Sequence, residues 1–366
     1  MRKKNKLILF LFFVFINLEA FSQFVELEDY PFINYNDNNI EFFGSSQKRF
    51  TPLFEKIKNT IAFGTNQVRV LHIGEKQTTD DIFTTQIYYN FSLTLCGLEA
   101  RRGMLWDEIT ILKSNKEIDY KVIDYDKKEY MLCKRFRLYH SPLNEDISIY
   151  IDDIGSAYKK VHYIDKGYTL FELTNPVYTV NLKIINKSDK DFTIYGHYLE
   201  SDNAGFIYDI VSNKNINELS TNNLLDNQLK TMNFDMVVIS LGKTAAYFSS
   251  YSSRKFKQDT KEILKKLRQI NPDVPILLTT PYDYYINNKP NPRLEQVSKD
   301  LIEIAKTSNC AIWNFYKIMG SANNWSKTNL MDYKKSSLTN RGSVLQGELY
   351  YNSFWQSFED YLNKAN

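Results

Sequence analysis

Four short apolar runs, separated by long stretches of chain, constrain the fold more than any other feature of this sequence. Runs of this length without polar alternation are typical of strands buried on both faces of a parallel sheet. Between them, segments 256–267 and 294–304 carry apolar residues at the spacing of amphipathic helices. The alternation predicts an α/β fold, a parallel sheet with helices on both faces. The four runs are 68–74, 236–242, 274–280 and 310–315.

Two further helices are predicted at the ends of this α/β region. Apolar residues recur at helical spacing from Phe50 to Ile61, and Gly64 follows as a stop signal. Segment 350–362 has the pattern of a closing helix.

A β-rich segment of about ninety residues, 105–195, interrupts the α/β pattern. Its apolar residues alternate at period two, and turn clusters separate the alternating stretches. This pattern predicts an inserted all-β sandwich. The expected organisation is an α/β domain in two parts, 23–104 and 196–366, with the sandwich between them.

The first 22 residues have the pattern of a secretory signal peptide. Four basic residues precede a short apolar run at 7–17, and Ala20 and Ser22 supply the small residues of a cleavage site. The apolar run is shorter than a typical membrane span. We therefore expect a periplasmic or secreted protein with no stable membrane span after cleavage; an uncleaved anchor is the alternative.

Charge and residue counts exclude several classes of function. The signal segment holds four of the 46 basic residues and one of the 43 acidic residues, so the remaining chain has no net charge. No overall basic field favours a nucleic-acid partner. Three scattered cysteines and four isolated histidines have no metal-ligand spacing, so we expect neither a metal nor a cofactor. The cysteines allow one disulfide at most, and the sequence does not decide whether it forms.

Several segments resemble the SGNH (GDSL-type) esterase and acyltransferase family. Residues 70–84 resemble the first block of the family, usually His-Ile-Gly-Asp-Ser-His, and 196–208 resemble the approach to the second. Residues 238–242 resemble the approach to the third block, usually Gly-Thr-Asn, and 338–347 resemble the C-terminal block. The resemblance is greatest to secreted bacterial members that carry an inserted β-sandwich and act on O-acetyl groups of glycans. It implies a flavodoxin-like parallel sheet.

The catalytic positions of that family are substituted here. The chemistry needs a serine nucleophile, a histidine base oriented by an aspartate, and donors that stabilise the oxyanion. The resemblance puts Lys76, after Glu75, at the nucleophile. The other positions hold Asn215 (or Ser212) at the second-block glycine, Thr244 at the third-block asparagine, Ser337 at the histidine and Lys334 at its aspartate. All four histidines lie before residue 198. This pattern predicts a pseudoenzyme that has lost the esterase chemistry.

Lysines replace or flank several of these positions, and we take Lys76, Lys214, Lys243 and Lys334 as a candidate binding site for an anionic group on a glycan. Ordinary solvated lysines are the competing interpretation. The predicted ligand is a polysaccharide or peptidoglycan-like glycan of the cell envelope, and an active SGNH homologue is a second expected partner.

Three alternatives stay open at this point. The first is an active carbohydrate O-acyl esterase or O-acetyltransferase with reassigned residues, for example a Ser–Lys pair of Lys76 with Ser336 or Ser337. The second is a purely structural partner of an active homologue. The third concerns the aromatic residues of the β-rich segment, which either stack on sugar rings or pack the sandwich.

Overall fold

The computed structural model describes residues 24–75, 81–95, 101–105, 110–123, 133–152, 157–213 and 228–365. The predicted signal segment 1–22 and residues Lys76, Cys96, Lys214 and Asn215 lie outside these ranges.

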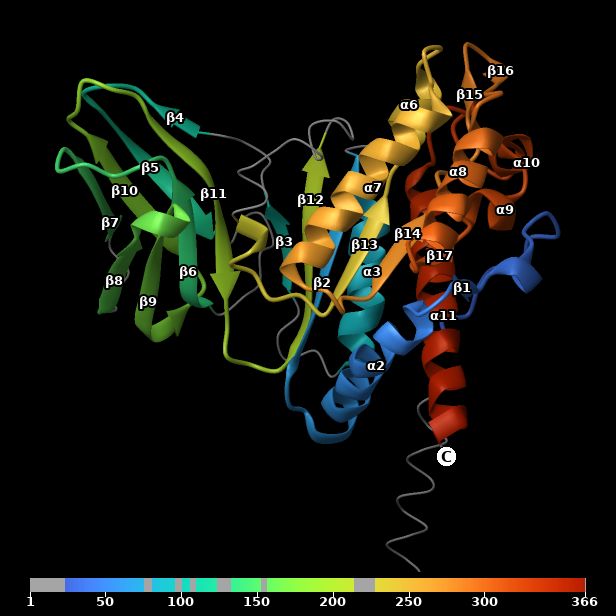
Figure 1. Cartoon of the computed structure of the whole chain (residues 1–366), viewed down its shortest axis with the longest axis horizontal. Helices are drawn as coiled ribbons and strands as arrows, with labels where there is room; N and C mark the ends of the chain where they lie inside the picture. The colour runs from blue at the N-terminus through green and yellow to red at the C-terminus, as the bar shows by residue number, and fades with distance from the viewer. Residues whose placement is uncertain are drawn as a thin grey trace, which may run out of the picture.

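The α/β domain is built on a seven-stranded sheet with the order β1-β17-β14-β13-β2-β12-β3 (Figure 1). Its strands are β1 (Ile40–Phe42), β2 (Gln67–Glu75), β3 (Arg101–Leu105), β12 (Gly205–Asn213), β13 (Met236–Ser240), β14 (Ile276–Thr279) and β17 (Ala311–Trp313). All pairings are parallel except that of β1, which lies antiparallel to β17 at one edge. The four strands predicted from apolar runs, β2, β13, β14 and β17, are confirmed; they lie next to one another in the sheet, and β12 follows beside β2.

Helices cover both faces of this sheet, as predicted (Figure 1). One group contains α2 (Ser46–Phe63), α3 (Asp81–Thr94) and α11 (Asn340–Ala365), and the other contains α6 (Lys243–Tyr247), α7 (Ser253–Ile270) and α8 (Leu294–Thr307). Two short helices, α9 (Phe315–Met319) and α10 (Ala322–Lys327), follow β17. Within the described ranges, none of the helices combines the length and apolar character that a membrane span needs.

The closing helix α11 begins ten residues before its predicted start at 350. Two glycines that argue against a helix from sequence allow its first turns to pack closely. A Cβ at Gly342 would lie 1.9 Å from the Leu330 carbonyl oxygen, and one at Gly347 would lie 2.7 Å from Cβ of Gln86 on α3. These glycines are therefore required by the close approach of α11 to its neighbours rather than by a turn.

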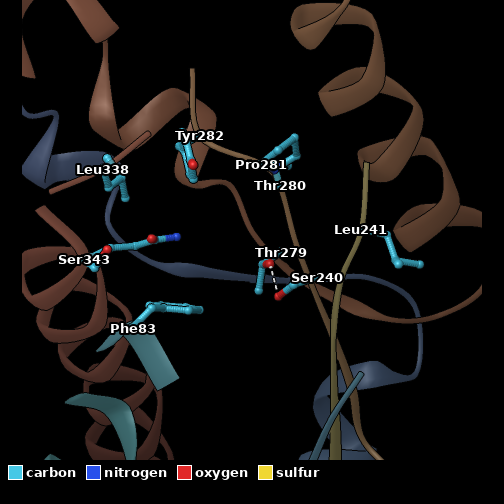
Figure 2. A pocket seen from close by; sticks show the side chains of 10 residues that line it. Phe83, Ser240, Leu241, Thr279, Thr280, Pro281, Tyr282, Leu338 and Ser343 are labelled. Atoms are coloured by element: carbon cyan, nitrogen blue, oxygen red, sulfur yellow. Dashed lines mark hydrogen bonds between the residues drawn. The ribbon is translucent and has the colours of Figure 1, made fainter. Parts of the chain in front are cut away.

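A row of hydrogen-bonded polar side chains crosses the four central strands inside the core. His72 on β2 is fully buried; its Nδ1 lies 2.8 Å from the Tyr208 hydroxyl on β12, and its Nε2 lies 2.6 Å from the Ser240 hydroxyl on β13. Ser240 is in turn 2.6 Å from the Thr279 hydroxyl on β14 (Figure 2). The row satisfies these buried polar groups and ties β12, β2, β13 and β14 together.

The predicted inserted β-sandwich is also present. A three-stranded sheet, β5-β10-β7, packs against a five-stranded sheet, β4-β11-β6-β9-β8, and all pairings are antiparallel. The strands are β4 (Thr110–Leu112), β5 (Lys116–Ile123), β6 (Cys133–His140), β7 (Ile147–Asp152), β8 (Tyr158–Tyr163), β9 (Tyr168–Val177), β10 (Val180–Asn186) and β11 (Phe192–Glu200). The predicted boundary at 195 falls inside β11, which continues in the five-stranded sheet to Glu200 before β12 joins the parallel sheet.

The sandwich has its own core, and several of its aromatic residues form that core. Phe136 and Phe171 are fully buried and stack with ring centroids 4.6 Å apart. Tyr139 and Tyr168 are buried too, but they pack into the core of the α/β domain, whereas Tyr150 and Tyr178 are exposed. The packing interpretation therefore holds for most of the described aromatic residues of this module.

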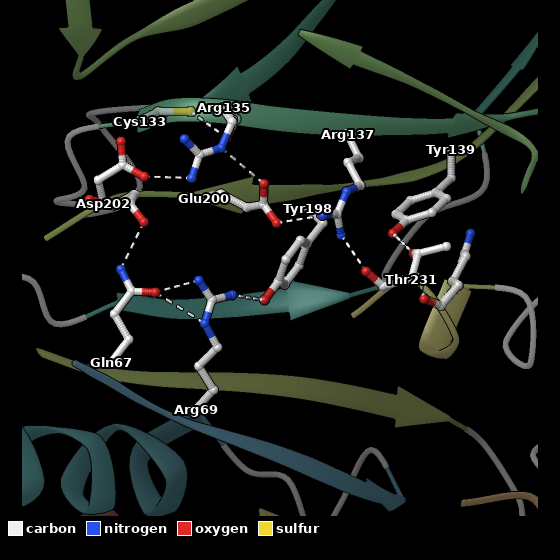
Figure 3. A network of polar contacts seen from close by, with 12 residues as sticks. Gln67, Arg69, Cys133, Arg135, Arg137, Tyr139, Tyr198, Glu200, Asp202 and Thr231 are labelled. Atoms are coloured by element: carbon white, nitrogen blue, oxygen red, sulfur yellow. Dashed lines mark hydrogen bonds and ion pairs between the residues drawn. The ribbon is translucent and has the colours of Figure 1, made fainter. Parts of the chain in front are cut away.

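Arginine and tyrosine side chains join the sandwich to the α/β domain (Figure 3). Arg137 on β6 donates to the Glu200 carboxylate at 2.7 Å and to the Thr231 carbonyl oxygen at 2.6 Å, just before β13. Its guanidinium lies over the ring of Tyr198, and Arg69 of β2 contacts the same ring and its hydroxyl. These contacts are largely screened from water, so they hold the two domains in one orientation.

We expect Arg137→Met to destabilise the protein, because Glu200 and the Thr231 carbonyl lose a partner while the apolar stem is kept. The free energy of unfolding should fall by about 1–3 kcal/mol in urea denaturation. Arg135→Gln is the control, since Arg135 lies 3.5 Å from Glu200 and pairs more closely with Asp202, which is 59% exposed; exposed pairs of that kind contribute less than about 1 kcal/mol. Equal effects of the two substitutions would contradict the assignment of Arg137 as the main domain contact.

Candidate functional site

The strand order places the expected ligand crevice between β2 and β13. After β2 the chain adds β3 and later β12 on one side of β2, and it then returns to form β13 on the other side. In open sheets of this kind, ligands bind outside the carboxyl ends of the strands at such a reversal of strand order. Glu75 ends β2, and Gly242, Lys243 and Thr244 directly follow β13, so the first-block and third-block residues meet at this point.

Glu75 occupies the space between the two strand ends. Its side chain is 1% exposed, and its Oε2 accepts a hydrogen bond of 2.8 Å from the backbone N–H of Thr244. Burial raises the pKa of Glu75 above its ordinary value, although N–H groups of Thr244 and Gly242 and the charge of Lys243 act in the opposite direction. An internal carboxylate therefore binds the backbone donors of the third-block turn.

Lys243 is also turned inward. It is 5% exposed, and its ammonium contacts the Tyr282 hydroxyl and lies 4.1 Å from the centroid of that ring and 5.4 Å from the Tyr284 ring. The Tyr284 hydroxyl donates to the Lys243 carbonyl at 2.8 Å. This lysine is enclosed by protein groups, unlike a solvated lysine that awaits a ligand.

The C-terminal block forms a turn closed by the bridge between Met331 and Leu338. Asp332 accepts hydrogen bonds from the Ser336 N–H at 2.8 Å and the Ser336 hydroxyl at 2.7 Å. Burial alone would raise the pKa of Asp332, but these bonds outweigh it and hold the pKa below its ordinary value. Ser336 is thus engaged with Asp332, and Ser337 is exposed.

Lys334 lies in the same turn and is exposed, with its ammonium 5.5 Å from the centroid of the Tyr333 ring. The environments of the predicted lysines therefore differ: Lys243 is buried under Tyr282, whereas Lys334 is on the surface. Lys76 and Lys214 lie outside the described residues, so the proposed basic site stays a prediction for them.

A small cavity lies beside these groups, lined by Phe83, Ser240, Thr279, Tyr282, Ser343 and Gln346 among others (Figure 2). About 20 Å³ of it is open to the centre of a water molecule, which is room for one or two waters. Ser240 reaches this cavity, but its hydroxyl already belongs to the buried row with His72 and Thr279. The cavity is too small for a sugar.

Among the described residues, no group of three or more His, Cys, Asp or Glu side chains could hold a metal ion. The expectation that the protein has no metal site stays a prediction for the rest of the chain. Cys133 and Cys310 are buried free thiols. His140, His162 and His197 lie on sandwich strands β6, β8 and β11.

One feature near the carboxyl ends of these strands was missed from sequence: a set of three exposed aromatic side chains and the half-buried Tyr285. Tyr247 and Phe248 at the end of α6 are 57% and 55% exposed, and their ring centroids lie 5.5 Å apart. Tyr333 is 83% exposed, and Tyr285 carries the Lys335 ammonium 4.7 Å from its ring centroid. We call Tyr247, Phe248, Tyr285 and Tyr333 the aromatic rim.

Backbone contacts hold the elements of the aromatic rim side by side. Tyr285 begins the hairpin of β15 (Tyr285–Ile286) and β16 (Lys289–Pro290), and its N–H donates to the Lys335 carbonyl at 2.7 Å. Arg293, after the hairpin, donates to the carbonyls of Ala246 and Tyr247 at 2.7 and 3.1 Å. The only signal in the sequence was the occurrence of aromatic residues shortly after predicted strands.

Glu75 both titrates and accepts a hydrogen bond from the Thr244 N–H, and we expect Glu75→Gln and Glu75→Ala to separate these two roles. Because the folded state holds the Glu75 proton more tightly than the unfolded chain, the stability from this group is present below the ordinary pKa of 4.5 and is lost as pH rises through the folded pKa. The stability of Glu75→Gln relative to the native protein should therefore improve as pH rises.

Glu75→Ala removes the acceptor of the Thr244 N–H and should cost about 1–3 kcal/mol across the pH range. Urea denaturation at a series of pH values measures both variants. A native protein whose stability relative to Glu75→Gln increases with pH would contradict the raised pKa.

Of the comparisons with known proteins, the search of solved structures finds similar proteins. Neither a family model nor a curated protein matches the sequence. Among solved structures, a peptidoglycan O-acetylesterase matches 88% of this chain and 99% of its own length, with 13% identity and a TM-score of 0.65. The salicylyl-acyltransferase SsfX3 matches 70% of this chain and 95% of its own, with 10% identity and a TM-score of 0.35. A lipase/acylhydrolase from Enterococcus faecalis matches 42% and 76%, with 16% identity and a TM-score of 0.31.

The fold assignment rests on the first of these structures, whose match covers a share of this chain that neither domain alone could supply. The flavodoxin-like strand order and the inserted sandwich agree with it. The predicted relationship is confirmed at the level of the fold: this chain has the SGNH hydrolase fold.

Proposed function

We propose that the protein is a glycan-binding SGNH-fold protein that does not carry out the ester hydrolysis of that fold. One observation carries the proposal: the described residues at the former catalytic positions are engaged in structural contacts or lack the required chemistry. Glu75 binds the Thr244 N–H, while the position expected for the catalytic histidine holds the exposed Ser337.

The catalytic base, the group that accepts the proton of the nucleophile, is the hardest part of the esterase machinery to replace. Acyl transfer by a hydroxyl needs a group that accepts its proton, usually a histidine. No histidine follows His197, and those at 140, 162 and 197 lie on sandwich strands. His72 is near the edge of the sheet, but it is fully buried and both its ring nitrogens have hydroxyl partners. Within the described ranges, no histidine is therefore placed to act as the base at this site.

The choice of a glycan as ligand rests on two supports. The similar solved structure is a peptidoglycan O-acetylesterase, and the aromatic rim exposes flat apolar faces beside the former catalytic edge. Aromatic rings are suited to stacking against the apolar faces of sugar rings, and Lys335 adds a cation beside Tyr285. Together with the signal pattern of residues 1–22, these features favour an exported protein of the cell envelope.

The proposal predicts that the mature chain, residues 23–366, does not hydrolyse p-nitrophenyl acetate or O-acetylated peptidoglycan above the buffer rate. Lys76→Ala and Ser337→Ala should change nothing, because neither residue is expected to act as a base or nucleophile. Turnover that either substitution abolishes would support the alternative of an esterase or O-acetyltransferase with reassigned residues.

The proposal also predicts binding of peptidoglycan fragments at the aromatic rim. Tyr247→Ala combined with Phe248→Ala should weaken binding about tenfold in calorimetry, since two stacking surfaces are lost. Phe63→Ala is the matched control, because Phe63 is 72% exposed but lies before β2, at the opposite end of that strand. No binding by the native protein would contradict the proposal and leave the structural partner of an active homologue as the remaining alternative.

A further inference from the structure

Positive charge is concentrated on one surface helix, α7 (Ser253–Ile270), which begins five residues after Phe248 of the aromatic rim. Its 18 residues include seven basic and two acidic side chains, a formal charge of +5, whereas the whole chain carries +3. Because the chain without its signal segment is neutral, the remainder of that chain carries a balancing negative charge. The protein is therefore electrically asymmetric, and α7 is a positive pole.

The exposed cations of α7 form a stripe along one side of the helix. Phe256, Ile263, Leu264 and Leu267 face the core, and Arg254, Lys261 and Lys265 are exposed on the outer side. These three, with the half-buried Lys257, recur at intervals of three or four residues, which aligns them on one face. From Arg254 to Lys265 the stripe is about 16 Å long. Figure 1 shows α7 on the outside of the sheet, toward the viewer.

Carboxylates neutralise only part of this stripe. Lys257 pairs with Glu303 at 2.9 Å, and Lys265 lies 3.8 Å from Glu262. Exposed pairs of this kind are weak and exchange readily for other anions. Arg254 and Lys261 have no ion pair within the part of the chain that the structure describes. Arg254 and Lys261 are therefore available to bind an anion, at a density of about one cation for every two helical turns. Lys257 and Lys265 become available when their weak ion pairs break.

The composition of the outer face of α7 excludes two classes of binding partner, membranes and single-stranded nucleic acids. Helices that bind membranes insert exposed apolar side chains, and no large apolar residue of α7 is exposed. Single-stranded nucleic acids need aromatic platforms for their bases, and the outer face of α7 has none. What remains is a straight row of flexible cations, which fits a linear chain of regularly spaced anions.

We propose that the α7 stripe (Arg254, Lys257, Lys261 and Lys265) is a binding surface for a linear acidic polysaccharide. The partner is a chain that carries carboxylate groups, and it binds through ion pairs along the helix without entering the candidate site. This inference rests on the proposed function only in taking a glycan as the ligand class, and it names a second surface and a charge requirement that the aromatic rim does not have.

The test compares Arg254→Glu/Lys261→Glu/Lys265→Glu with a control of equal charge, Lys58→Glu/Lys187→Glu/Lys364→Glu, whose lysines are exposed on other elements. The probe is sodium alginate, a polyuronate, with neutral dextran, anionic vesicles and single-stranded DNA as comparators. In low salt the α7 variant should bind alginate at least about tenfold more weakly than the native protein, and the difference should shrink as salt increases. The control should lose less than about threefold.

Equal losses in the two triple variants would overturn the inference, because they would show a response to net charge alone. Tighter binding of vesicles or DNA than of alginate would also overturn it. Unchanged circular dichroism and unfolding midpoints establish that the variants are folded. If peptidoglycan fragments still bind through the aromatic rim while the α7 substitutions have no effect on alginate, the α7 surface is wrong and the proposed function stands; if neither ligand binds, both fail.

Discussion

The buried hydrogen-bonded row through His72 fixes the centre of this protein. A polar side chain within a sheet core costs several kcal/mol when it lacks a partner, so the four groups from Tyr208 to Thr279 are stable only when their strands lie in the observed register. A shift of any one strand by a residue would turn its member of the row toward the opposite face. The row therefore specifies the arrangement of β12, β2, β13 and β14 more strictly than apolar packing alone would.

That register determines which residues lie together at the carboxyl ends of the central strands. Ser240 pairs with Gly74, which brings Glu75 and the turn after β13 to the same place. Glu75 then reaches the Thr244 N–H, and Lys243 turns beneath Tyr282 and Tyr284. Each contact depends on the strands below it, so the edge is an extension of the core and not an independent loop cluster.

Much of this arrangement could be predicted from sequence, and the exceptions have physical reasons. Apolar runs identified the central strands because strands buried on both faces must be apolar. Strand β12 was recognised only as the approach to a motif, since Tyr208 and Asp209 interrupt its apolar pattern. The bond between His72 and Ser240 could not be predicted, because the two residues lie 168 positions apart and no local pattern links them. Burial of Lys243 could not be predicted, because lysine is usually solvated and its cover comes from Tyr282 on another segment.

The internal contacts at the carboxyl ends of β2 and β13 show how polar groups beside a ligand crevice can be satisfied without a ligand. An active site holds donors that wait for a substrate, and a site without substrate would leave those donors buried and unsatisfied. Glu75 is one methylene longer than the aspartate usual in the first block, and its carboxylate binds the donors of the third-block turn from within. Among the described residues, the cavity lined by Ser240, Tyr282 and Gln346 beside these groups holds only a water or two. The proposed recognition of glycans therefore uses side chains outside this cavity, those of the aromatic rim and the α7 stripe.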